Sequence, residues 1–292
     1  MLKLELVEAV LARALKGGAD FAEVYAQRAK KRRMKVRQGA LEEALSGLDY
    51  GAGVRLFFGT EVVYAYTNDL TQEGLMEALE TLLRAKGALG KVDEGGKGGL
   101  DFRKATPKGL HAPKVPYGEK DKRYRLERLL EAEAGARIAP AIKQVEASLL
   151  EWEEEVLVAN TEGVFAEEKR VRTRLFVLAV AQDGAEVQTG YSAPGKSVGL
   201  ELFDLYPPKA VGEKAARQAL TNLKARPAPA GTFPVVVGPG FGGVLFHEAV
   251  GHLLETTSVA RKASVLADKL GEVVASPAVT YIDDGTLPHA WG

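Results

Sequence analysis

The segment that decides the fold class is QVEASLLEWEEEVLVANTEGVFAEEKRVRTRLFVLAVAQDGAEVQTGY, residues 144–191. It is rich in Val, which favours strands, and Thr161-Glu162-Gly163 and Asp183-Gly184 are turn sequences. The segment therefore predicts a series of antiparallel strands: 145–152, 154–159, 164–168, 170–182 and 185–191.

Helices flank this series on both sides. Apolar residues at helical spacing predict helices over 2–16, 70–86, 121–134 and 209–224, the second with Thr71 as its N-cap. Strand-like segments lie between the first two helices, and Gly59-Thr60 marks a hairpin turn. These segments are 21–28, 34–38 and 53–67. The pattern predicts an α+β fold: an N-terminal α/β region with antiparallel sheets and flanking helices, then the start of a β-rich C-terminal domain.

Glycine and proline mark the expected domain boundaries. A chain of 292 residues is long enough for two or three domains. Glycines and prolines between 87 and 120 predict a linker or long loop, and Arg226-Pro227-Ala228-Pro229-Ala230-Gly231 predicts a second boundary. We expect these regions: 1–90, an N-terminal α+β subdomain; 91–120, the linker; 121–225, a central α+β subdomain; 226–292, the start of a C-terminal domain.

Composition excludes several functional classes. Lysine plus arginine equals aspartate plus glutamate at 39 each, so no net charge favours nucleic acid or an anionic membrane. No stretch of about 18 uninterrupted apolar residues predicts a membrane span, and the N-terminus has the pattern of an amphipathic helix, not of a signal peptide. The chain has no cysteine, which excludes thiolate chemistry within it and fits a cytosolic protein.

The last region is expected to run strand, turn, helix, strand. Its parts are 233–237, 238–243, 244–255 and 279–282. The turn contains Gly238-x-Gly240-x-x-Gly243, a dinucleotide-binding pattern, and so a nucleotide-dependent enzyme is one alternative. The pattern also requires an acidic residue about 20 positions further on, but Asp283 and Asp284 lie about twice that distance away. A tight backbone turn is the simpler interpretation.

The predicted helix carries His247-Glu248-Ala249-Val250-Gly251-His252. Neutral imidazoles are good ligands for zinc, and a neighbouring carboxylate can act as a general base. The common spacing in zinc peptidases places the histidines at i and i+4, about 40° apart around the helix, whereas i and i+5 are about 140° apart. A shared metal therefore requires a departure from α geometry, such as a π-bulge eased by Gly251. Two histidines with structural roles are the alternative.

Other charged and histidine-containing segments suggest surface roles. The glutamates around Trp152 are most simply a solvated strand edge, and the basic run 30–33 is expected on the surface. His111 and His289 lie in segments that suggest loops, and neither is expected in a site.

Together these residues resemble the TldD/PmbA family, and specifically its TldD branch. The segments that carry the resemblance are 229–231, 234–240, 247–252, 271–277 and 283–288, with weaker matches at 18–24, 53–55 and 65–68. The resemblance implies a cytoplasmic metallopeptidase that cleaves extended or unfolded peptides. It implies His247 and His252 as ligands of a divalent metal ion, with zinc expected, and Glu248 as the general base.

The family also implies a partner and a further ligand. Members usually act with a PmbA-type subunit, so we expect that partner or a homo-oligomer, and neither nucleic acid nor membrane. The family's third metal ligand is a cysteine far along its C-terminal domain, which this chain lacks. We therefore expect a C-terminally incomplete member. The alternative is a non-catalytic subunit that binds peptide or scaffolds a complex.

Overall fold

The computed structural model describes residues 1–87, 100–105 and 111–291. It divides into two compact units, which we describe separately. Unit 1 comprises Met1–Phe58, Val62–Ala225 and Gly285–Gly292, and unit 2 comprises Gly59–Glu61 and Arg226–Asp284. Much of the predicted linker, 91–99 and 106–110, lies outside the described residues.

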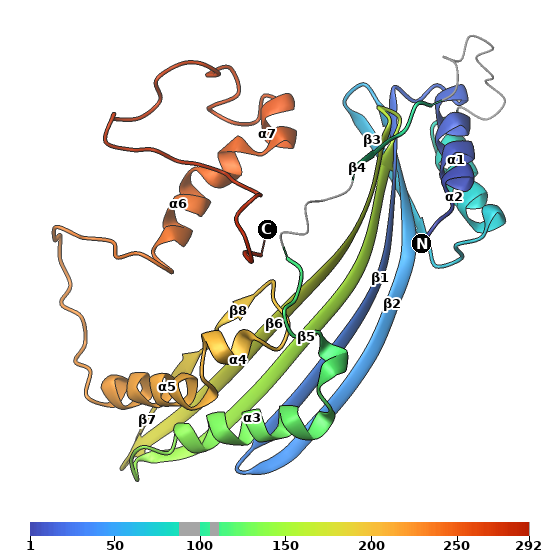
Figure 1. The fold of residues 1–292 in the computed structure, drawn as a ribbon. Coiled ribbons are helices and arrows are strands. Elements are labelled where there is room, and N and C mark those ends of the chain that lie inside the picture. The colour runs from blue at the N-terminus through green and yellow to red at the C-terminus, as the bar shows by residue number, and fades with distance from the viewer. Residues whose placement is uncertain (88–99, 106–110, 292) are drawn as a thin grey trace. The chain divides into compact units, whose positions relative to one another are not determined.

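Unit 1 is built on an eight-stranded sheet with the order β3-β2-β1-β5-β6-β4, in which β7 and β8 also pair with β6 (Figure 1). All described pairings are antiparallel except that of β4 with β6. The strands are β1 (Phe21–Arg37), β2 (Ala40–Phe58), β3 (Glu61–Thr67), β4 (Arg103–Ala105), β5 (Ile142–Asn160), β6 (Val164–Asp183), β7 (Glu186–Ser192) and β8 (Gly195–Lys196). The α+β class is confirmed.

The strands are longer than predicted. The segments 145–152 and 154–159 are one strand, β5, and 164–168 and 170–182 are one strand, β6. Likewise 21–28 and 34–38 form the single strand β1. The predicted breaks fell on charged residues, but these pair with charges on neighbouring strands, as Arg32 does with Glu153 at 3.3 Å. Cross-strand ion pairs let a strand continue through a polar stretch.

The strand β2 begins thirteen residues earlier than the predicted start at Gly53, at Ala40. Leu45, Leu48 and Tyr50 of this added part are all exposed. The added part therefore has no buried apolar face from which a strand can be recognised. By contrast, the hairpin turn at Gly59-Thr60 is confirmed, with Gly59 at φ 59°.

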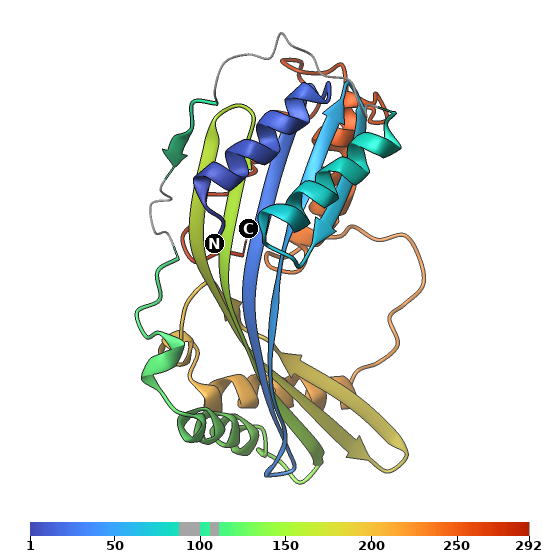
Figure 2. The same cartoon turned by 90° about the vertical axis from the view of Figure 1, so that its right-hand side faces the viewer.

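Two pairs of helices pack on one face of the sheet. They are α1 (Leu4–Lys16) with α2 (Gln72–Ala85), and α3 (Lys122–Gly135) with α5 (Pro208–Leu223); shorter helical turns are η1 (Tyr117–Glu119) and α4 (Leu202–Leu205). The predicted N-cap is confirmed, since Thr71 Oγ1 accepts a hydrogen bond from Gly74 N at 3.2 Å. Figure 2 shows α1 and α2 over one end of the strands, with α3 and α5 at the other.

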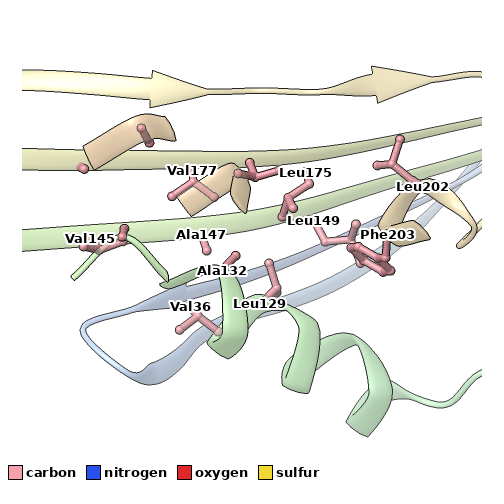
Figure 3. Packing of buried hydrophobic residues seen from close by; sticks show 14 of the residues in the cluster. Val36, Leu129, Ala132, Val145, Ala147, Leu149, Leu175, Val177, Leu202 and Phe203 are labelled. Carbon is pink, nitrogen blue, oxygen red and sulfur yellow. The ribbon is translucent and has the colours of Figure 1, made fainter. Parts of the chain in front are cut away.

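Each helix pair covers its own hydrophobic core. Leu157 of β5 packs with α1 and α2, whereas Leu149 packs with α3 and α5 (Figure 3). Both are odd-numbered residues of one strand, so both cores lie on the same face of the sheet. The opposite face, which carries even-numbered residues of β5 such as Trp152, is not covered by these helices.

Charged residues at the middle of the sheet are buried, which corrects one expectation. Glu151 is only 2% exposed, and Glu154 5%. The expectation of a solvated strand edge was wrong for Glu151 and Glu154 because β5 is a central strand between β1 and β6, whereas the side chains of Glu153 and Glu155 are exposed. Glu151 is neutralised by Arg125 of α3, whose Nε lies 2.5 Å from Oε1. A buried carboxylate needs such a partner to offset its desolvation.

Unit 2 contains only short helices: α6 (Gly243–Ala249), η2 (Gly251–Leu254) and α7 (Thr256–Ala260). The predicted strands 233–237 and 279–282 are wrong, since both segments are irregular. A strand requires a neighbouring strand with which to form backbone hydrogen bonds. No residue of the segment 226–284 lies in a strand, so the two apolar segments have no such neighbour within it. Without the preceding strand, Gly238-x-Gly240-x-x-Gly243 lacks the context of a dinucleotide-binding turn.

None of the helices in the described part of the chain combines the length and the apolar character that crossing a membrane requires.

Candidate metal centre

The helix that carries the motif ends inside it. The α6 helix stops at Ala249, Val250 adopts φ −129° and ψ −43°, and a 3-10 turn begins at Gly251. The predicted departure from α geometry between His247 and His252 is therefore confirmed. The departure is not the π-bulge suggested from the sequence. It is the end of the α-helix at Ala249 followed by a 3-10 turn. The expected single helix over 244–255 is corrected in the same way.

This break brings the two imidazoles together. The ring centroids of His247 and His252 lie 4.6 Å apart, with the planes inclined at 68°. One ligand atom from each of His247, Glu248 and His252 lies within 4.8 Å of the others, and all three side chains are exposed. Within the described ranges no other three His, Asp or Glu residues are grouped in this way.

Glu255 supports one of the histidines. Nδ1 of His252 lies 2.7 Å from Oε1 of Glu255, and its Nε2 lies 3.5 Å from Oε2 of Glu248. The hydrogen bond to Glu255 raises the pKa of His252 above its ordinary value, with a smaller contribution from the charge of Glu248. A carboxylate on one imidazole nitrogen commonly fixes the tautomer and orientation of a metal-binding histidine. Glu255 was not among the site residues predicted from the sequence, although an acid three residues after a histidine was the available signal.

Gly251 allows the two parts of the motif to approach. A Cβ at this position would lie 3.1 Å from Nδ1 of His247 and 3.1 Å from the hydroxyl oxygen of Tyr281. Glycine is therefore favoured here by space, and its φ is not in the left-handed region. The same contact places the hydroxyl of Tyr281, which was not predicted as a site residue, beside the motif.

The donor set fits a divalent transition metal. Two imidazoles and a carboxylate are ligands that zinc accepts, and their exposure leaves room for water and substrate. His111 and His289 are not part of this group: they lie in unit 1 with their ring centroids 6.5 Å apart, and His289 Nδ1 lies 3.2 Å from the carbonyl oxygen of Ser197. The fold and the donor set together define the class, a mixed helix and antiparallel-sheet protein with a candidate metal centre.

Comparison with known proteins identifies the family. Three family models match consecutive parts of the chain: PmbA/TldA metallopeptidase domain 1 over 22–86, the central domain over 113–223 and the C-terminal domain over 230–292. The chain is 32% identical over 283 residues to the metalloprotease TldD homolog of Haemophilus influenzae, and 30% identical over 269 residues to a metalloprotease of Methanothermobacter thermautotrophicus. The chain belongs to the TldD/PmbA family.

The matches span most of this chain but only part of its relatives. They cover 94% and 92% of the chain, but 57% and 58% of the Haemophilus and Methanothermobacter proteins. Among solved structures, TldE from Thermococcus kodakarensis aligns with a TM-score of 0.67 and 17% identity over 90% of this chain and 58% of its own. A protein from Bacteroides thetaiotaomicron, described as a modulator of DNA gyrase, gives a TM-score of 0.71 and 19% identity over 94% and 63%. At these identities the structural matches support the fold alone.

Proposed function

We propose that the protein hydrolyses peptide bonds in extended or unfolded peptides, with His247 and His252 as ligands of a divalent metal ion and Glu248 as the general base. The observation that carries this proposal is the convergence of the three side chains within 4.8 Å across a broken helix. Curated relatives named as metalloproteases support it.

Each residue has a defined task in this proposal. Glu248 accepts a proton from the attacking water and returns it to the leaving amine nitrogen. His252 presents Nε2 because its Nδ1 is engaged by Glu255. A divalent ion at this site, which we propose to be zinc, supplies an acidified water and polarises the peptide carbonyl.

Two roles are open to Glu248, and removing its charge distinguishes between them. It could be a general base, or it could be a third ligand, since its Oε2 lies 3.5 Å from His252 Nε2. If it is the base, Glu248→Gln retains the metal and loses hydrolysis by about a hundredfold or more. The assay measures cleavage of an unstructured peptide together with the metal content of the purified variant.

A matched control is available in the same unit. Glu272 lies outside the motif and pairs with Lys269 at 2.8 Å, so Glu272→Gln should leave both metal content and hydrolysis unchanged. Retained hydrolysis in Glu248→Gln would sink the mechanism, and loss of the metal would assign Glu248 as a ligand instead.

A second candidate function is a non-catalytic subunit that binds peptide. It is favoured by the ligand count, because catalytic zinc sites commonly have three protein ligands, whereas the proposed set supplies two and the chain has no cysteine. Metal content discriminates between the two. A stoichiometric ion that is lost in His247→Ala supports the peptidase, and an absence of metal in the assembled complex supports the scaffold.

We also propose that the protein assembles with a PmbA-type partner or with itself, as the family resemblance implies. Co-purification with such a partner, followed by measurement of the complex mass, tests this. A monomer that remains alone in the presence of the partner contradicts it.

A further inference from the structure

A pocket lies in unit 1, on the sheet face that the four long helices leave uncovered. Its volume is about 460 Å³. Residues of β1, β2, β5 and β6 line it, and Trp291 adds an aromatic side chain from the segment 285–291. Figure 1 shows β1, β5 and β6 running side by side along this part of the sheet. The metal motif is not part of this pocket.

Cations and indole rings are layered in this pocket. Trp152 of β5 is paired with Lys31 on β1 and with Arg172 on β6. The Lys31 ammonium lies 4.7 Å from a Trp152 ring centroid, and the Arg172 guanidinium carbon lies 5.3 Å from it. Two positions along β6, Arg174 stacks on Trp291 at 4.3 Å. The rings therefore hold the cationic groups along one row of the pocket.

Within the described part of the chain, the two arginines of this row, Arg172 and Arg174, have no carboxylate partner. Lys31 pairs with Asp49 at 2.5 Å, and Arg33 pairs with Glu43 at 3.4 Å. Arg172 and Arg174 have no ion pair within 4.0 Å among the residues that the structure describes. Glu151, the carboxylate in the pocket lining, is already paired with Arg125. The pocket therefore has positive charge that its own residues leave uncompensated.

Two hydrogen-bond donors in the same row have no acceptor. The indole Nε1 of Trp152 and the Nε of Arg174 are both buried atoms without a partner in the described structure. Buried donors of this kind are uncommon, because each one left unpaired costs free energy. A ligand that carries acceptor oxygens and a negative charge would offset part of the positive charge of Arg172 and Arg174 and would bring acceptors to this side of the pocket.

We propose that this pocket binds a carboxylate group of a peptide, either an acidic side chain or a free C-terminus. Arginine forks match the planar carboxylate, and the indole N–H supplies a further donor. A nucleic-acid backbone fits less well, since Asp49, Glu43 and Glu153 border the cationic row and the chain has no net charge. The peptide nature of the ligand rests on the proposed function, but the carboxylate chemistry does not.

Tryptophan fluorescence tests the proposal directly, because Trp152 and Trp291 are the only tryptophans of the chain and both line this pocket. The probes are a capped Ala-Glu-Ala-Glu-Ala amide, its Gln-containing counterpart, and a capped penta-alanine with a free or an amidated C-terminus. We expect saturable quenching only with a carboxylate-bearing probe. Comparison of the Glu-containing with the Gln-containing peptide tests for a side-chain carboxylate. Comparison of free with amidated penta-alanine tests for a C-terminal carboxylate. Because hydrolysis is not measured, the readout is independent of the metal motif, and Glu248→Gln can serve as the host.

Substitutions identify the binding groups. Arg174→Gln and Arg172→Gln should each weaken binding of the acidic peptide about tenfold, the effect of losing one charge-assisted hydrogen bond. Arg174→Lys should recover part of the loss, because it retains the charge but not the fork. Lys169→Gln removes one positive charge from the same strand, at a side chain that is 82% exposed and outside the pocket, and should bind normally.

Three outcomes overturn the proposal. One is equal quenching by the acidic and the Gln-containing peptides together with equal quenching by both forms of penta-alanine. Another is the same loss of binding in Lys169→Gln as in the arginine variants. The third is tighter binding of a single-stranded oligonucleotide than of every carboxylate peptide, which would assign the pocket to phosphate instead.

Discussion

The contact between α3 and α5 predicts that Gly212→Ala destabilises the protein, whereas helix propensity alone predicts that it stabilises the protein. Gly212 lies inside α5, where replacement of glycine by alanine normally stabilises a helix by about 1 kcal/mol. In this structure a Cβ on Gly212 would overlap the carbonyl oxygen of Ala132 on α3 and would lie 2.8 Å from the backbone nitrogen of Ala136. These are backbone atoms, so no side-chain rotation can relieve the overlap.

The magnitude follows from two opposing effects. Inserting a methyl group into a packed interface costs about 1–3 kcal/mol, and the upper part of this range applies because the two helix backbones must separate. After subtraction of the propensity gain, we expect Gly212→Ala to lower the free energy of unfolding by about 1.5 kcal/mol. With a denaturant slope of about 3 kcal/mol per molar urea, the midpoint falls by about 0.5 M.

Urea unfolding followed by far-UV circular dichroism measures this effect. Thr221→Ala on the exposed side of the same helix gains propensity without an overlap, so its midpoint should stay the same or rise slightly. A midpoint for Gly212→Ala equal to or above that of the parent protein would refute the reasoning, because α3 and α5 would then not be in contact at this position.

Two further predictions concern the metal motif and acid stability. Glu255→Gln weakens zinc binding about tenfold or more in a chelator competition assay, because the hydrogen bond that orients His252 is weakened; unchanged affinity would remove Glu255 from the site. Burial of Glu201 by itself raises its pKa, but hydrogen bonds from backbone N–H groups, with those of Lys114 and Val115 the largest, outweigh it and hold the pKa below the ordinary value of 4.5. The stability from this carboxylate is therefore fully present above pH 4.5 and is lost as the pH falls through the lowered pKa. Urea midpoints between about pH 3 and 7 should converge with those of Glu201→Gln at the acidic end, and parallel curves contradict the assignment.

Local signals determined much of the fold. Thr71 was identified as an N-cap because its hydroxyl bonds the backbone three residues ahead, and Gly59 as a turn because glycine adopts positive φ without strain. Both depend on neighbours within a few residues. The spacing of His247 and His252 likewise predicted a departure from α geometry if both bind one metal ion, since side chains five residues apart lie about 140° apart around the helix axis.

Only the tertiary structure decided the features that depend on distant partners. The segment 233–237 is as apolar as a strand, but it finds no hydrogen-bonding neighbour in unit 2, whereas the exposed start of β2 is a strand because β1 lies beside it. The glutamates near Trp152 suggested a solvated edge, but β5 pairs with β1 on one side and β6 on the other, and Arg125 forms an ion pair with Glu151. The sequence by itself determined which residues could bind metal and where helices begin. Chain segments far apart in sequence decided which of the described charges are buried and which arginines have no partner among the described residues. They also decided which side chains crowd Gly251, because burial and hydrogen bonding depend on neighbours in space.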